Sequence, residues 1–176
     1  MSIVVNNKRF VEFLSKQELD NIITNLAAEV ERDLGEKDPL YLVMLNGAFV
    51  FASDFLRKLT KPVETVFLRY SSYEGINTTG NVHVNVIPQV VKDRNVVVLE
   101  DIIDTGLTMD VFLKNIKNLH PQSVSIVSLF SKPTARKINV PLDYVGIEIE
   151  NSFVVGFGLD YDGYGRNLDA LYVLEE

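Results

Sequence analysis

Carboxylates and hydroxyl groups gather in one short stretch of this sequence, directly after a continuous apolar run. Val96 to Leu99 is followed by the acidic residues Glu100, Asp101 and Asp104 and then by the segment Thr105 to Thr108. A continuous apolar run predicts a strand that is buried on both faces, at the centre of a parallel sheet. Because open α/β sheets bind ligands at the carboxyl ends of their strands, these residues are the first candidates for a ligand site.

The chemistry of this stretch indicates a phosphorylated sugar together with a metal ion. Asp104, Thr105, Gly106 and Thr108 predict a tight turn into a helix, where backbone N–H groups, hydroxyl groups and the positive helix end suit a phosphate monoester. Nearby carboxylates would repel phosphate unless they bind sugar hydroxyl groups, accept a proton or contact Mg²⁺ that substrate oxygens hold. The plainer alternative is a strand followed by a helix that Asp104 or Thr105 merely caps.

Several familiar chemistries are excluded by the sequence. It has no cysteine, which rules out thiolate nucleophiles and thiolate zinc sites, and its histidines, His83 and His120, stand far apart. Neither a P-loop nor a dinucleotide-binding glycine motif occurs. With 17 basic and 24 acidic residues the formal net charge is −7, which argues against broad nonspecific binding of nucleic acid. Any anionic ligand must therefore be held locally.

The elements that would position these residues alternate between strands and helices. Ser15 and Glu18 have the spacing of a capping box, which predicts an amphipathic helix over 15–34 that Gly35 ends. Further strands are expected at 40–45, 63–70, 82–86, 96–99 and 124–130, helices at 48–59 and 108–119, and a polar loop at 71–80. Near the end of the sequence, strands at 144–149, 153–155 and 171–174 follow without long helices between them. The pattern predicts an α/β fold with a smaller subregion in its last part.

The length of 176 residues and the hydrophobic content of 47% are typical of one globular domain. The longest uncharged apolar stretch, residues 39–53, is shorter than the roughly 20 residues that cross a bilayer. The first residues show no signal-peptide pattern. We therefore expect a single domain over residues 1–176, a cytoplasmic location and no membrane partner.

The motif after the central strand resembles the phosphoribosyl-pyrophosphate motif of type I phosphoribosyltransferases, in particular those that act on hypoxanthine and guanine. Two acidic residues, two apolar residues and Asp-Thr-Gly-x-Thr occupy positions 100–108, and collinear matches extend from Leu45 to Arg166. The resemblance implies a central, mostly parallel sheet that is flanked by helices, with a small hood. It also implies a core at about 36–131 and a hood at about 132–176 that includes N-terminal residues.

The resemblance assigns one group of residues to phosphoribosyl pyrophosphate. In the family, the turn that matches Asn46 and Gly47 binds pyrophosphate through backbone amides, often across a non-proline cis peptide, and glycine permits the close approach. Many relatives carry a basic residue at the position of Asn46, so this chain lacks that charge. The other implied contacts are Glu100, Asp101, Asp104, Thr105, Gly106, Leu107, Thr108 and Arg166.

A second group of residues is assigned to the purine. Lys132 would donate to the 6-oxo group, because an ammonium group has only donors and selects an oxo over an amino group. Phe153 would stack on the base, with the Val154 backbone at the base edge, Ile102 on the opposite side and Asp160 nearby. Without the resemblance, Phe153 and Val154 would be interpreted as core strand residues and Lys132 as a solvated surface residue.

The resemblance further implies purine salvage, in which the 5-phosphoribosyl group moves from phosphoribosyl pyrophosphate to hypoxanthine or guanine and pyrophosphate is released. Mg²⁺ is the implied cofactor, associated with Glu100, Asp101 and Asp160, and Asp104 is the implied catalytic base. A homodimer or homotetramer that binds small molecules and no nucleic acid is expected. Two alternatives stay open: a xanthine-preferring enzyme, and a regulatory protein that senses phosphoribosyl pyrophosphate while it binds nucleic acid.

The polar loop at 71–80 contains Ser72 and Tyr73, which match the catalytic lid of the family. Its polar residues and glycines bury little area to offset the entropy of ordering, so we expect fast amide hydrogen exchange in the free protein. A mimic of both substrates should protect the loop, and Tyr73→Ala should weaken binding of this mimic more than binding of a bare purine. Equal exchange with and without the mimic would contradict the lid hypothesis.

Overall fold

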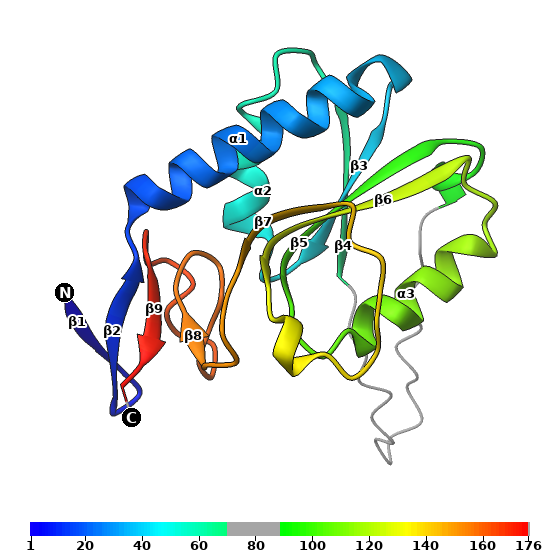
Figure 1. Ribbon diagram of the computed structural model, residues 1–176. Helices are drawn as coiled ribbons and strands as arrows, with labels where there is room; N and C mark the ends of the chain where they lie inside the picture. The colour runs from blue at the N-terminus through cyan, green and yellow to red at the C-terminus, as the bar shows by residue number, and fades with distance from the viewer. Residues whose placement is uncertain (70–88, 176) are drawn as a thin grey trace.

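The computed structural model describes residues 1–69 and 89–175 and contains a larger parallel sheet beside a smaller antiparallel one (Figure 1). The loop expected at 71–80, with Ser72 and Tyr73, and the strand expected at 82–86 lie outside the described residues. Within the described ranges, no helix is long and apolar enough to cross a membrane.

The larger sheet has five strands that all pair in parallel. This part of the chain comprises α1 (Lys16–Leu34), η1 (Gly35–Lys37), β3 (Leu40–Leu45), α2 (Phe49–Leu56), β4 (Glu64–Arg69), η2 (Gln89–Val91), β5 (Asn95–Ile103), α3 (Leu107–Lys117), β6 (Ser123–Ser131), η3 (Pro133–Ala135) and β7 (Tyr144–Glu148). The strand order is β4-β3-β5-β6-β7. Tyr41 and Val43 of β3 pack with α1 and α2, whereas Leu40 and Leu42 pack with α3 on the other face. Both faces are covered, which explains the continuous apolar runs.

The α/β fold and the parallel sheet that the sequence predicts are confirmed, and the element ends differ by a few residues. Ser15 caps α1 through the predicted capping box: its Oγ accepts from the Glu18 N–H at 3.3 Å, and the Glu18 carboxylate accepts from the Ser15 N–H at 2.8 Å. The strand expected at 96–99 is longer, because β5 keeps pairing with β6 as far as Ile103. Glu100 and Asp101 therefore lie on the strand itself and not after it.

Strands from both ends of the chain build the smaller sheet, which we call the hood (Figure 1). Its members are β1 (Ser2–Val5), β2 (Lys8–Leu14), β8 (Val154–Val155) and β9 (Leu171–Leu174), in the antiparallel order β1-β2-β9-β8. Strands β1 and β2 were not predicted from the sequence. A register shift between Glu12 and Leu14 breaks the period of two along β2. The Asn6-Asn7 pair, with positive φ at both residues, is the turn signal that could have revealed the hairpin.

The larger sheet extends further along the chain than expected. The hood was expected to begin at about residue 132, but β7 pairs in parallel with β6, so the larger sheet ends at Glu148. The crossover from β6 to β7 contains only the short helix η3. Because no long helix connects β6 and β7, the strand–helix alternation in the sequence ends after β6, although the larger sheet continues through β7.

Candidate active site

A cavity of ≈ 110 Å³ opens where β5 ends and α3 begins. It is lined by the predicted residues Glu100, Ile102, Asp104, Thr105, Gly106 and Thr108 and also by Ile103 and Met109. Sequence reasoning did not select Ile103 and Met109, because both are apolar and belong to the hydrophobic core under α3. Their position inside the motif was the only signal. The structure therefore gathers most of the predicted phosphate-binding segment around one cavity.

The turn between β5 and α3 is held in place by the chain that follows η3. The Thr105 carbonyl oxygen accepts hydrogen bonds from the N–H groups of Lys137, at 3.0 Å, and Ile138, at 3.2 Å. The Thr105 hydroxyl accepts from the Leu107 N–H at 3.4 Å. Since α3 starts at Leu107, the first N–H groups of this helix border the cavity, and this geometry suits a phosphate monoester.

The half-buried Glu100 and the buried Asp101 form a pair of carboxyl groups near the end of β5. Burial and the neighbouring Asp101 raise the pKa of Glu100 well above its usual value. Burial also raises the pKa of Asp101 to about 6, although backbone N–H groups and the Arg166 charge act in the opposite direction. The Glu100 Oε2 atom is buried and has no hydrogen-bond partner. The pair is therefore incompletely satisfied and can accept hydroxyl groups or positive charge from a ligand.

The turn after β3 lies against this carboxyl pair. The Leu45–Asn46 peptide is cis. A Cβ at Gly47 would lie 1.8 Å from the Asp101 Oδ2 atom, so only glycine fits there. From the other side, a Cβ at Gly158 would lie 2.2 Å from the Gly47 carbonyl oxygen. The turn, β5 and the loop between β8 and β9 thus meet at one point.

Arg166 and Asp160, both in the loop between β8 and β9, bind each other. Arg166 Nη2 lies 2.6 Å from Asp160 Oδ1, and its Nη1 donates to the Gly158 carbonyl oxygen at 2.8 Å. Asp160 Oδ2 accepts from the Gly163 N–H at 2.7 Å. This network connects the predicted pyrophosphate-binding arginine to the Asn46–Gly47 turn. The close approach of Gly158 to this turn was not predicted from the sequence, although the Gly156-Phe157-Gly158 pattern could have indicated it.

The residues predicted to bind the purine lie on both sides of the junction between the hood and the larger sheet. Lys132 is buried, and its Nζ atom lies 3.4 Å from Asp104 Oδ2. Phe153 is 46% exposed, whereas Val154 is buried in the same hydrophobic core against which Ile102 packs. Lys132 is therefore not a solvated surface residue, and Val154 and Ile102 belong to one hydrophobic cluster.

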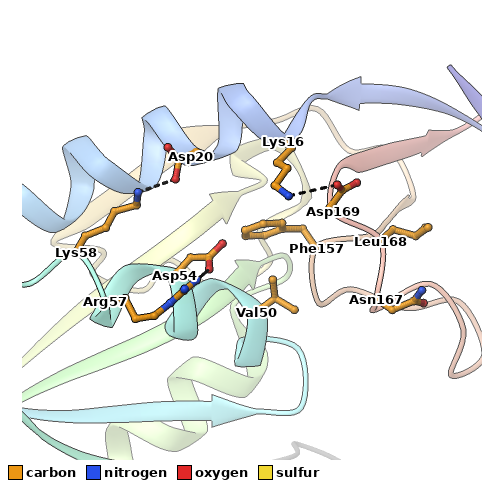
Figure 2. Close-up of a pocket in the computed structure, with 10 residues that line it drawn as sticks. All are labelled: Lys16, Asp20, Val50, Asp54, Arg57, Lys58, Phe157, Asn167, Leu168 and Asp169. Carbon is orange, nitrogen blue, oxygen red and sulfur yellow. Dashed lines mark hydrogen bonds and ion pairs between the residues drawn. The ribbon is translucent and has the colours of Figure 1, made fainter.

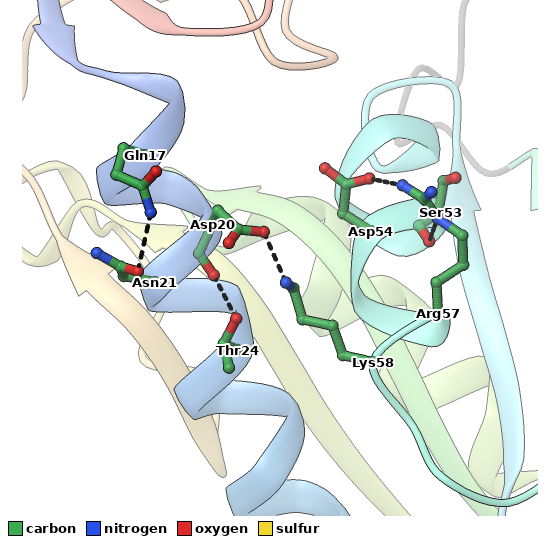
Figure 3. Close-up of polar contacts among 8 residues, drawn as sticks. All are labelled: Gln17, Asp20, Asn21, Thr24, Ser53, Asp54, Arg57 and Lys58. Carbon is green, nitrogen blue, oxygen red and sulfur yellow. Dashed lines mark hydrogen bonds and ion pairs between the residues drawn. The ribbon is translucent and has the colours of Figure 1, made fainter.

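A larger cavity of ≈ 510 Å³ lies between α1, α2 and the segment that precedes β9 (Figure 2). None of the predicted site residues lines it. Its charged side chains already pair with each other, as Lys16 with Asp169 at 3.6 Å, Lys58 with Asp20 at 2.6 Å, and Arg57 with Asp54 (Figures 2 and 3). Because these charges are paired, we place the candidate site at the smaller cavity.

The acidic side chains near the smaller cavity fit a metal ion that the substrate carries. Across residues 1–69 and 89–175, no three histidine or acidic side chains gather as a ready-made metal site. Mg²⁺ commonly keeps water and substrate oxygens and takes only one or two protein carboxylates. The unpartnered Glu100 Oε2 atom and the neighbouring Asp101 suit that mode, and Asp160 is held by Arg166 across the Gly47 turn.

Comparison with known proteins shows the family of this chain. The model of the phosphoribosyl transferase domain matches residues 12–162. The chain belongs to the phosphoribosyl transferase family. The hypoxanthine phosphoribosyltransferase of Haemophilus influenzae is 38% identical, over 93% of this chain and 95% of its own length. The hypoxanthine-guanine-xanthine phosphoribosyltransferase of Tritrichomonas foetus is 35% identical, over 92% of this chain and 90% of its own.

The fold of this phosphoribosyltransferase is shared with solved structures. A crystal structure of a hypoxanthine-guanine phosphoribosyltransferase from Bacillus anthracis, with HEPES in its active site, has a TM-score of 0.83 at 32% identity. The match covers 94% of this chain and 97% of that one. The resemblance seen in the motif at 100–108 is therefore confirmed, while the roles of single residues stay predictions.

The buried Asp101 carboxyl group predicts a pH dependence of stability. Its pKa is raised from 3.8 to about 6. The stability that its preference for the neutral form contributes is therefore complete below about pH 4 and is lost as the pH rises through about 6. Asp101→Asn stays neutral, so its free energy of unfolding should increase relative to the wild type by about 2–3 kcal/mol between pH 4 and pH 8. Chemical denaturation measures this difference. Glu150→Gln, at an exposed position, is the control, and a difference for Asp101→Asn that stays constant with pH would contradict the prediction.

Proposed function

We propose that this phosphoribosyltransferase salvages purines by transferring the 5-phosphoribosyl group from phosphoribosyl pyrophosphate to hypoxanthine or guanine. The observation that carries the proposal is the buried Lys132 ammonium group, 3.4 Å from the Asp104 carboxylate, which itself lines the cavity at the end of β5. This pair supplies a donor for a 6-oxo group and a base next to the phosphate-binding turn. The names of the relatives from Haemophilus influenzae and Tritrichomonas foetus support the same substrates.

The proposed site binds phosphoribosyl pyrophosphate in three places. The 5-phosphate lies at the turn 105–108, where α3 begins at the edge of the cavity and its positive end favours an anion. The ribose hydroxyl groups donate to the carboxyl groups of Glu100 and Asp101, which gives the Glu100 Oε2 atom the partner that it lacks in the free protein. The pyrophosphate lies between the backbone of the Asn46–Gly47 turn and Arg166.

Glu100, Asp101 and Asp160 are the protein groups that would hold Mg²⁺, directly or through water. Bound there, the ion would supply positive charge to the departing pyrophosphate. The backbone N–H groups of the Asn46–Gly47 turn and the Arg166 guanidinium group act on the same oxygens. Because the substrate, the turn and Arg166 share these contacts, the protein requires no closed metal site of its own.

The proposed transfer moves one proton to the protein. A ring nitrogen of the purine attacks the anomeric carbon while the bond from that carbon to pyrophosphate breaks, and the proton of the purine ring passes to Asp104. Lys132 donates to the 6-oxo group and holds the Asp104 carboxylate in place. Phe153, the Val154 backbone and Ile102 bind the base. Three further expectations stay predictions. They are that residues 1–176 form one domain, that the protein is cytoplasmic, and, as the alternative function, that it is a regulatory protein.

We also propose that the enzyme is a homodimer or a homotetramer. Phe49 on α2 and Phe67 on β4 are 43% and 60% exposed. Phe67 pairs with Val43, so its side chain lies on the face of the sheet that α1 and α2 cover. Large aromatic side chains that are exposed on the surface favour contact with a second copy. Light scattering of the purified protein measures the oligomeric state.

An assay of pyrophosphate release with five nucleobases tests the proposed function. We expect release with hypoxanthine and guanine and none with adenine, cytosine or uracil, because Lys132 selects an oxo group on a purine. Xanthine belongs in a parallel reaction, since the Tritrichomonas foetus relative is named for it as well. Release with xanthine alone would favour the xanthine-preferring alternative, and no release with any 6-oxopurine would refute the proposal.

Asp104→Asn should reduce kcat well over tenfold and leave KM for phosphoribosyl pyrophosphate nearly unchanged. The amide keeps the shape and hydrogen bonding of the side chain but cannot accept the proton. Steady-state kinetics with hypoxanthine measure the effect. Asp93→Asn, an exposed position before β5, is the matched control. Turnover of Asp104→Asn close to that of the control would show that Asp104 is not the base.

A further inference from the structure

We propose that Phe10 and Tyr161 position the ring of Phe153, so that the N-terminal hairpin of the hood sets the affinity for the purine. This inference rests on the proposed function, because it takes Phe153 as the residue that stacks on the base. Phe10 lies on β2, Phe153 directly precedes β8, and Tyr161 lies between β8 and β9. The family match begins at residue 12, so it does not include Phe10.

The three aromatic rings form a closed cluster. The ring centroids of Phe10 and Phe153 are 6.3 Å apart, those of Phe10 and Tyr161 are 6.2 Å apart, and those of Phe153 and Tyr161 are 5.5 Å apart. The Phe153 and Tyr161 rings meet edge to face, at 78°. These separations lie in the range in which aromatic rings attract each other. Each ring therefore restricts the orientation of the other two.

Exposure separates the roles of the three rings. Phe10 is completely buried, whereas Phe153 is 46% exposed. The buried ring therefore supports one side of Phe153, and the exposed side stays accessible to a planar ligand. An unsupported phenyl ring at the surface would lose rotamer freedom when it stacks on a base, and this loss would weaken binding. In the cluster, much of that freedom is already lost in the free protein.

The hairpin also holds Tyr161. Lys8 Nζ lies 5.1 Å from the centroid of the Tyr161 ring, and Asn6 Nδ2 donates to the Tyr161 carbonyl oxygen at 3.4 Å. Tyr161 and Tyr164 exchange backbone hydrogen bonds of 2.9 and 3.0 Å, which close the turn between them. The aromatic cluster thus connects β1 and β2 to the loop that contains Asp160 and to the base-stacking residue.

Steady-state kinetics separate this inference from the proposed function. An inactive wild-type protein with every 6-oxopurine would refute the proposed function and the inference with it. With an active wild type, Phe10→Leu should raise KM for hypoxanthine about three- to tenfold, as expected for the loss of aromatic contacts, and leave KM for phosphoribosyl pyrophosphate within about twofold. Phe13→Leu makes the same change on the same strand. Phe13 is 44% exposed and has no ring contact within the described part of the chain, so this control should resemble the wild type.

A double-mutant cycle identifies the route of the effect. If Phe10 acts through Phe153, Phe10→Leu should have no further effect on KM for hypoxanthine in a Phe153→Leu protein. If Phe10 only stabilises the hood, Phe10→Leu should lower Tm and change both KM values equally, in the wild type and in the Phe153→Leu protein. That result would overturn the inference. Tyr161→Leu, at a less buried position, provides the same test if Phe10→Leu does not fold. An unchanged KM for hypoxanthine in these variants would also overturn it.

Discussion

The Asp101 carboxyl group and the Gly47 backbone lie in contact at the carboxyl edge of the parallel sheet, and the position of the site depends on this contact. A side chain at position 47 would collide with Asp101, so the turn after β3 reaches β5 only because it contains glycine. Gly158 approaches from the hood, where a side chain would collide with the Gly47 carbonyl oxygen. Three segments that are distant in sequence therefore meet at one backbone turn.

The same contact concentrates an electrostatic cost at the site. Asp101 is buried beside the half-buried Glu100, both have raised pKa values, and the buried Glu100 Oε2 atom has no hydrogen-bond partner. The Arg166 charge reduces the cost for Asp101 only in part. A ligand that brings hydroxyl groups and a cation would satisfy both carboxyl groups at once. The two carboxyl groups that destabilise the free protein are thus those that would gain hydrogen bonds and an opposite charge from the proposed ligand, a phosphorylated sugar with its metal ion.

The elements that were predicted correctly from the sequence are those that a local pattern of neighbouring residues determines. The capping box at Ser15 and the apolar run at 96–99 depend on local rules, and both elements are present. The hairpin at 2–14 was missed because a register shift breaks its alternation. Phe10 and Gly158 were missed for a different reason. Their importance comes from partners far away in the chain, and a single sequence does not show which distant residues meet.

The order β1-β2-β9-β8 in the hood has a consequence for synthesis of the protein. The ribosome makes β2 early, but its partner β9 follows only after the whole larger sheet, whose last strand ends at Glu148. Until then the hairpin has an open edge, and β2 lacks its neighbour. The turn at 105–108, where we propose that phosphate binds, is synthesised before Phe153, which we propose stacks on the base. We therefore expect the part of the proposed site that contains Phe153 to be completed last, when β9 pairs with β2 and β8.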